Sequence, residues 1–224
     1  MATYSIGDLG RRELLQISAV LAAAGTVAFA KPAGAETLQI TPQQILGPFY
    51  PLTEFPQTSD LTRLPGRSGR ANGQVLNVMG RVMNIAGEPV RGAKVEVWQA
   101  NASGRYTHPS DPNPAPLDPN FDGTALLTTD ASGRYGFKTI KPAAYPTGPT
   151  TMRPAHIHFQ VTGRQDRLVT QMYFAGDPYN ATDPFLNSVP APRKDLLIVK
   201  LQDPAAEFEP DSKVAVFDMV VFKG

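Results

Sequence analysis

Proline and glycine interrupt this chain at intervals too short for long helices. The 224 residues include 22 Pro and 19 Gly, and no stretch of useful length after residue 35 has the 3.6-residue hydrophobic period of a helix. Between the interruptions lie short segments of alternating apolar and polar residues, as in half-buried strands. Such segments joined by turns are typical of a β-sandwich. We therefore expect an all-β fold, a β-sandwich of mixed topology with long active-site loops.

The alternation also indicates where the strands and loops lie. Three long segments rich in proline or turn residues interrupt it, at 101–123, 141–154 and 175–192. Loops of this length are usually functional or disordered, so the chemistry is expected there. The predicted strands cover 74–82, 93–98, 134–140, 155–162 and 167–174, with two closing strands near 195–201 and 214–222.

The first 35 residues have the pattern of an export signal. A twin-arginine sequence, GRRELL at 10–15, precedes an uncharged stretch over 14–30, and small-residue cleavage sites follow. The alternative is a membrane anchor, but the uncharged stretch has 17 residues and a spanning helix needs ~20. We expect residues 1–35 to be a cleaved twin-arginine signal peptide. The chain would then be periplasmic or secreted, exported already folded and not membrane-bound after cleavage.

The remaining residues, 36–224, are expected to form one domain, with 36–72 as an extended arm packed on it. Without the signal the chain has 18 basic and 18 acidic residues and no basic cluster. This balance gives no reason to expect nucleic acid as a partner. The chain has no cysteine, which excludes disulfides, zinc–thiolate sites and cysteine-held iron–sulfur clusters.

Two of the three histidines occupy alternate positions of one predicted strand. Residues i and i+2 of a strand point to the same face, so His156 and His158 lie side by side while Ile157 and Phe159 face the apolar core. Two imidazoles placed in this way can form half of a metal site. The plainer alternative is a pair of histidines hydrogen-bonded on a solvated face.

The other half of a metal site would have to come from oxygen ligands. Without cysteine, the available donors are carboxylate, phenolate and water. Each of the first two long loops carries a tyrosine close to a strand, Tyr106 and Tyr145. Their spacing alone does not select them as ligands, because a loop tyrosine is more often a packed aromatic with its hydroxyl paired.

Seven short runs occur in a characteristic order along the chain. They are LGPFY at 46–50, GAKVEVWQAN at 92–101, GRY at 104–106, APLDPNF at 115–121, TIKP at 139–142, RPAHIHF at 153–159 and TQMYFAGDP at 170–178. Through these runs the chain resembles the intradiol ring-cleavage dioxygenases, and among them the iron-bearing β-subunits of protocatechuate 3,4-dioxygenases. The resemblance covers about residues 44–222.

The resemblance implies a non-haem Fe(III) cofactor. The ligands by motif are Tyr106, Tyr145, His156 and His158. Phenolate is a hard anionic donor, so two phenolates favour Fe(III), and neutral imidazoles complete the set. The implied reaction cleaves a catechol-type ring with O2 to a cis,cis-muconate-type diacid. Colourless Zn²⁺ at the histidine pair is the rival metal.

The same resemblance assigns roles to side chains around the metal. It implies that Tyr145 leaves the metal when substrate binds and takes up one of its protons. Arg153 would stabilise negative charge on the substrate, and Gln171 would orient a histidine or a bound group. Without the motif, Arg153 would be read as a surface salt-bridge partner and Gln171 as a polar strand residue.

The run at 46–50 implies a substrate pocket lined by Gly47, Pro48 and Tyr50. A Gly-Pro turn followed by aromatic residues is an equally good structural motif. We interpret Trp98 as a core residue and His108 as a loop residue, not as a ligand.

The expected partners are a small catechol-type molecule and O2. The related β-subunits pair with a second chain, and the sequence leaves open whether this chain pairs with such a subunit, with itself or with neither. Thr147 and Met152 stand where the β-subunits carry tryptophan, which leaves the ring substituents open. The competing function is a non-catalytic binding module of the transthyretin-like or carboxypeptidase-regulatory kind, whose strand pattern this chain also fits.

Overall fold

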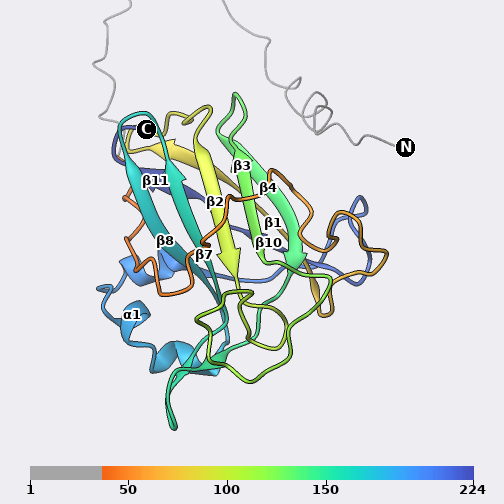
Figure 1. Ribbon diagram of the computed structural model, residues 1–224. Helices are drawn as coiled ribbons and strands as arrows, with labels where there is room; N and C mark the ends of the chain where they lie inside the picture. Colours follow the sequence, from red (N-terminus) through yellow and green to blue (C-terminus); the bar gives the residue numbers. More distant parts are fainter. Residues whose placement is uncertain (1–36) are drawn as a thin grey trace, which may run out of the picture. The chain divides into compact units, whose positions relative to one another are not determined.

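The computed structural model describes residues 37–224, so the predicted export signal lies outside the described part. These residues form two main β-sheets, one short two-stranded pairing and only single turns of helix (Figure 1). The expected all-β class with mixed strand directions is confirmed. No helix within 37–224 has the length and apolar character needed to cross a membrane.

The smaller sheet is built around the long strand β1 (Val75–Asn84). Strand β4 (Arg134–Ile140) runs antiparallel along one edge of β1. Along the other edge, β10 (Lys213–Val216) and then β11 (Met219–Val221) both run parallel to it. The strand β1 is therefore fully paired only by segments that lie far away in the sequence.

The larger sheet has the strand order β3-β2-β7-β8-β9. Its neighbours are antiparallel except for the pair β8 and β9, which is parallel. The bounds are β2 Lys94–Gln99, β3 Thr124–Thr128, β7 His156–Thr162, β8 Arg167–Phe174 and β9 Ile198–Val199.

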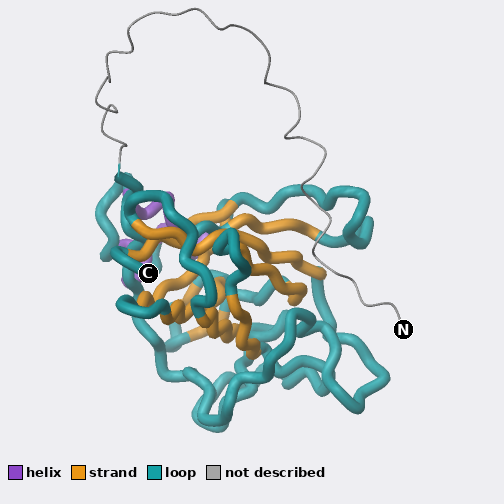
Figure 2. The backbone as a smooth tube through the Cα atoms, turned by 90° about the horizontal axis from the view of Figure 1, so that it is seen from above, coloured by secondary structure: helices purple, strands orange, loops and turns teal. Residues whose placement is uncertain are grey.

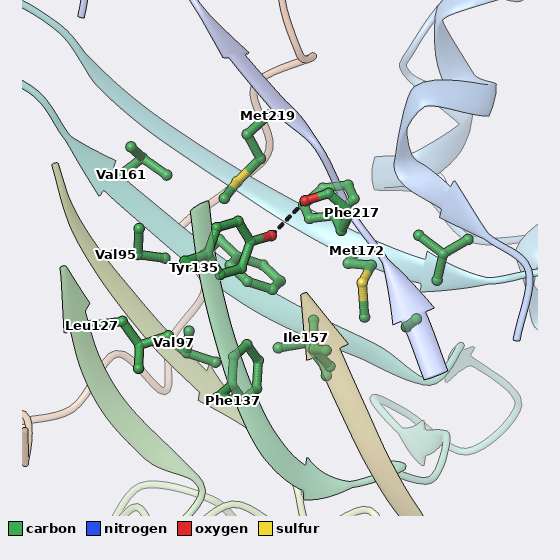
Figure 3. Close-up of a cluster of buried hydrophobic side chains, with 14 of the residues drawn as sticks. Val95, Val97, Leu127, Tyr135, Phe137, Ile157, Val161, Met172, Phe217 and Met219 are labelled. Atoms are coloured by element: carbon green, nitrogen blue, oxygen red, sulfur yellow. Dashed lines mark hydrogen bonds between the residues drawn. The ribbon is translucent and has the colours of Figure 1, made fainter. Parts of the chain in front are cut away.

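The core fills the space between the two sheets (Figure 3). Val95 and Val97 of β2 and Ile157 of β7 are fully buried, and they face the aromatic residues of β4. The Tyr135 hydroxyl also lies in this layer and donates a hydrogen bond of 2.5 Å to the carbonyl oxygen of Phe217. A buried carbonyl oxygen needs a hydrogen-bond donor. The tyrosine hydroxyl supplies it here in place of a backbone N–H from a neighbouring strand.

The long loops gather at one end of the sheets, as the ribbon and the tube view both show (Figures 1 and 2). The loop 141–154 contains a two-residue pairing that the sequence pattern did not reveal, β5 (Tyr145–Pro146) with β6 (Met152–Arg153). The loop after β8 contains the single helical turns η2 (Pro178–Ala181) and α1 (Pro184–Asn187).

Two of the predicted strands differ from the structure, and one longer strand was missed in addition to the two-residue strands β5 and β6. The strand expected over 195–201 is reduced to β9, because residues 193–197 form the 3-10 turn η3 (Arg193–Leu197). The strand expected over 214–222 is divided at Phe217 and Asp218, where the Asp218 carboxylate accepts from the Arg81 backbone. The missed strand is β3, which follows directly on the proline-rich loop.

Residues 37–72 form an arm that touches both sheets. The arm begins against the smaller sheet, where the Thr41 backbone donates to Val220, and it reaches the larger sheet where Gln44 donates to Val169. It then crosses the outer face of the larger sheet, and Tyr50 packs its ring edge-on against Trp98 at 5.1 Å between centroids. The polar outer face of this sheet is therefore covered by the arm and the loops.

Candidate metal centre

Strand β7 places its two histidines on the covered outer face of the larger sheet. Ile157 and Phe159 point into the core and are fully buried, as the alternation predicts. His156 and His158 point the other way, yet each is only 2% exposed. The plainer alternative of two solvated histidines is therefore wrong.

The two imidazoles point nitrogen atoms at each other. The Nδ1 atom of His156 lies 2.7 Å from the carbonyl oxygen of Pro154, and it must donate because a carbonyl only accepts. The Nε2 atom of His156 consequently carries a lone pair, and it lies 3.2 Å from the Nε2 atom of His158. A proton or a cation is needed between two such atoms.

Tyr106 brings an oxygen to the same point. Its hydroxyl lies 3.4 Å from the Nε2 atom of His156. The loop around Tyr106 is held by polar side chains of its own: the Asp111 carboxylate accepts from the Tyr106 backbone at 2.7 Å, and the Asn113 amide donates to Gly104 at 2.9 Å. The tyrosine is therefore held on a braced loop.

A glycine brings the first two long loops together. Gly104 has a positive φ of 79°, and a Cβ atom there would lie 2.6 Å from the carbonyl oxygen of Ala144. This close approach places the next residue, Tyr145, beside the others. Its ring stands perpendicular to that of Tyr106 at 5.6 Å and lies 5.7 Å from that of His156.

Burial dominates the electrostatics of the four side chains. It lowers the pKa of His156 to about 3 and that of His158 well below 6.5, so both imidazoles are neutral in the metal-free chain. Burial also raises the pKa of Tyr106 well above 10, with the Tyr145 charge adding to it, and raises that of Tyr145, which the Arg153 charge opposes. Buried phenols of this kind ionise only in the presence of a strong cation.

The donor set fits a metal ion. Two donor atoms that share one metal at about 2.1 Å each lie about 3.0–3.4 Å apart. The two histidine nitrogens are 3.2 Å apart, and the Tyr106 oxygen is 3.4 Å from His156 Nε2, in agreement with this. Within 37–224 no group of three or more His, Cys, Asp or Glu side chains could hold a metal. A metal here would depend on the tyrosine oxygens, and hard phenolate donors suit Fe(III).

Aromatic residues enclose the four candidate ligands. Trp98 stacks flat on His158, with 4.7 Å between ring centroids and an angle of 13°. Trp98 is buried, as expected of a core residue, but it lies with Tyr106 and Tyr145 beside the site and not in the main core between the sheets. Phe49, which the sequence did not single out, lies 4.8 Å from the Tyr106 ring and 6.4 Å from the Tyr145 ring. Its place in the run at 46–50 was the one sequence signal that pointed to Phe49.

The predicted pocket residues lie at different distances from the ligands. Gly47 touches one of them, since a Cβ atom there would be 3.2 Å from Cε1 of His158. Pro48 is exposed. The Tyr50 hydroxyl donates to Glu96 at 2.9 Å, on the far side of Trp98. Of these three, Gly47 alone borders the candidate metal centre.

A cavity lies next to this group of side chains. It is lined by Phe49, Trp98, Tyr106 and His108, among others. The His108 Nδ1 atom accepts from the Ser110 backbone at 3.2 Å. His108 is therefore a loop residue beside the cavity and does not join the two histidines of β7.

Arg153 and Gln171 lie behind the candidate ligands. The Nε atom of Arg153 forms an ion pair of 2.7 Å with Asp183, and its Nη2 atom donates to Gln171 Oε1 at 2.7 Å. Arg153 is 5% exposed, so the alternative of a surface salt bridge is wrong. Asp183 was missed because it lies in a loop with no motif around it.

The family model described as a dioxygenase matches residues 45–223. The protocatechuate 3,4-dioxygenase beta chain of Burkholderia cepacia is 52% identical over 147 residues, which cover 64% of this chain and 63% of that protein. The catechol 1,2-dioxygenase of Acinetobacter baylyi is 36% identical over 157 residues, which cover 64% of this chain and 49% of that protein. The chain thus spans between half and two thirds of the length of these relatives.

Solved structures give the same result. The dioxygenase domain of a dioxygenase and carbohydrate-binding protein fusion from Streptomyces sp. SirexAA-E superposes with a TM-score of 0.63 at 26% identity, covering 83% of this chain and all of that domain. The mercury-inhibited catechol 1,2-dioxygenase of an Acinetobacter species gives 0.63 at 28% identity, covering 81% of this chain and 62% of that chain. The chain belongs to the intradiol ring-cleavage dioxygenase family.

Proposed function

We propose that this chain is a non-haem Fe(III)-dependent intradiol dioxygenase that cleaves a catechol-type ring with O2 to a cis,cis-muconate-type diacid. One observation carries the proposal: two tyrosines and two histidines from three separate segments meet in a buried site. A non-catalytic binding module has no use for such a donor set.

Tyr106, Tyr145, His156 and His158 would hold the iron. When bound, the ferric ion would withdraw electron density from a chelated catechol, so that the ring can react with O2. The His156 Nδ1 hydrogen bond to Pro154 keeps the Nε2 lone pair pointed at the site. Trp98 stacked on His158 excludes water from that side and keeps the imidazole from turning.

Tyr145 is the ligand suited to proton transfer. Burial raises the pKa of both tyrosines and the Arg153 charge opposes it at both, but at Tyr106 the Tyr145 charge raises the pKa further. A tyrosinate at this place can accept a proton from a catechol hydroxyl at its Oη atom.

Arg153 and Gln171 would act on the bound ring from behind. The guanidinium is permanently charged and held in place by its bonds to Asp183 and Gln171. A fixed positive charge near a ring that becomes electron-rich lowers the energy of the transition state.

The test combines a metal assay with a spectrum. The purified chain is expected to contain iron and to absorb in the visible range through tyrosinate-to-Fe(III) charge transfer. The band should shift to longer wavelength when a catechol is added without O2. Admission of O2 should give a ring-opened diacid, identified by mass, with catechol, protocatechuate and hydroxyquinol compared as substrates.

Two outcomes would contradict the proposal. A chain that stays colourless after iron loading lacks the tyrosinate–iron centre. A chain that binds zinc in preference to iron, with no O2 uptake, would be a different metalloprotein.

The cell location is a second part of the proposal. We propose that the chain acts in the periplasm or outside the cell, because the twin-arginine pattern at 10–15 is typical of export in the folded state. Replacing Arg11 and Arg12 with lysine should retain the full-length chain in the cytoplasm. Export of that variant at the normal level would contradict this part.

A further inference from the structure

A buried ion pair lies behind the candidate metal centre. Its members are Arg153 and Asp183, whose Nε and Oδ2 atoms are 2.7 Å apart and whose side chains are 6% and 0% exposed. Loss of one partner from a buried pair leaves an uncompensated charge, which is strongly destabilising. The buried guanidinium of Arg153 therefore needs the Asp183 carboxylate as its counter-charge.

Asp183 is itself held from two other directions. Its Oδ1 atom accepts from the Leu186 backbone at 2.7 Å and caps α1. Its carbonyl oxygen accepts from the backbone of Asn187 at 3.0 Å and from the Asn187 side chain at 2.7 Å. One carboxylate oxygen is thus committed to the helical turn and the other to Arg153, so the carboxylate has no freedom to rotate.

The guanidinium is held equally firmly. Its Nη2 atom donates to Gln171 at 2.7 Å and to the Tyr173 hydroxyl at 3.0 Å. The Phe185 ring lies 4.6 Å from the Cζ atom. A planar group fixed through two of its nitrogens has a fixed third nitrogen as well. The whole guanidinium therefore has one fixed orientation.

This guanidinium cluster (Arg153, Asp183, Gln171 and Tyr173) connects two parts of the site. Arg153 lies directly opposite Tyr145 in the β5–β6 pairing, and residues opposite each other in such a pair have neighbouring side chains.

On its other side the cluster holds the arm. The Gln171 amide donates to the Ile45 carbonyl at 2.9 Å, and the Tyr173 hydroxyl lies 2.9 Å from Oε1 of Gln44. Two residues further along the arm, Gly47 touches His158. The cluster therefore links the candidate ligand Tyr145 to the arm, which covers the candidate ligand His158.

We propose that Asp183 is a positioning residue, which fixes the guanidinium of Arg153 beside Tyr145 and thereby keeps the arm at Gln44 and Ile45 seated over the metal centre. The inference rests on the proposed function for its effect on turnover. Its effect on the arm does not depend on iron.

The test replaces Asp183 with asparagine. An amide has one acceptor oxygen, so Asp183→Asn can serve the helical turn or Arg153 but not both, and it leaves the guanidinium charge uncompensated. We expect iron to remain bound and kcat to fall by about 10–100-fold, as is typical for residues that orient the groups around a metal. Asp183→Glu, which keeps the carboxylate, should recover part of the loss.

The second readout is hydrogen exchange of the metal-free chain. The Gln44 amide, which donates to Val169, should exchange faster in Asp183→Asn while the amides of β2 and β7 remain protected. Tyr173→Phe keeps the Arg153–Asp183 ion pair but removes the hydroxyl that contacts Arg153, Gln171 and Gln44. It should therefore speed exchange in the arm even if Asp183→Asn fails to fold.

Asn187→Ala is the matched control. It weakens the same helical turn by removing the side-chain bond to Asp183 but leaves the ion pair intact, so kcat and arm exchange should stay at the wild-type values. Positioning by Asp183 is overturned if Asn187→Ala reproduces the losses, or if neither Asp183→Asn nor Tyr173→Phe changes arm exchange. A colourless, inactive wild type would refute the proposed function alone, since arm exchange still tests Asp183.

Discussion

The contact between Gly47 and His158 can be tested by adding one methyl group. Gly47 has φ of +80°, a left-handed conformation that costs an L-residue about 1–2 kcal/mol. In Gly47→Ala the new Cβ atom would also lie 3.2 Å from Cε1 of His158, and forcing a methyl group into a packed site costs about 1–3 kcal/mol more. The two costs together predict that Gly47→Ala lowers the free energy of unfolding by about 2–5 kcal/mol.

A second glycine separates the two contributions. Gly66 lies in the same arm with φ of +77°, and a Cβ atom there would meet nothing within 4 Å. Gly66→Ala should therefore show only the backbone cost, about 1–2 kcal/mol, or roughly 2–8 °C in melting temperature for a domain of this size. Its iron content, visible band and kcat/KM should match the wild type.

The cost of Gly47→Ala beyond that of Gly66→Ala comes from the contact with His158, so its effect should appear at the metal centre. If the arm lifts to relieve the contact, an excess of about 1–3 kcal/mol corresponds to roughly a 5–150-fold loss of iron affinity, since each 1.4 kcal/mol is tenfold. Iron affinity is measured by competition with a chelator, together with the position of the visible band. Equal iron affinity and equal spectra in the two alanine variants would refute the reasoning.

Three further variants test other parts of the structure. Tyr106→Phe removes one phenolate donor, so we expect loss of visible absorption and of iron, with the far-ultraviolet circular dichroism unchanged. Tyr135→Phe leaves the Phe217 carbonyl unsatisfied and should lower the free energy of unfolding in urea by about 1–3 kcal/mol without affecting turnover. Burial disfavours the Asp60 carboxylate, but hydrogen bonds from Thr62 and Lys138 outweigh this and lower its pKa below 3.8. The stability lost in Asp60→Asn should therefore be greatest at neutral pH and shrink as the pH falls below 3.8, and a loss independent of pH would contradict this.

The sequence predicted the features that depend on strict alternation. His156 and His158 could be assigned to one face because side chains alternate in a strand, and the central strands are long enough for that period to be visible. The strands that were missed or misplaced are short or irregular. Thr124–Thr128 has five residues, and the final segment is broken at Phe217 because its carbonyl pairs with a side chain.

The candidate site could be predicted only in part from the sequence, because several of its residues depend on contacts with distant segments. Phe49 and Asp183 are defined by what they touch, and their partners lie more than 25 residues away along the chain. No local pattern encodes such contacts. Gly104 is a similar example, because its need to be glycine comes from the Ala144 carbonyl of another loop.

The pairing of β1 with β11 has a consequence for the time course of folding. Arg81 and Asp218, which are hydrogen-bonded, are 137 residues apart in the sequence, and contacts between such distant residues form slowly because a long loop must close first. During synthesis one edge of β1 stays unpaired until residues up to Val221 have left the ribosome. An open edge of this kind recruits other strands, so a chaperone that shields β1 at this stage should raise the yield of folded protein.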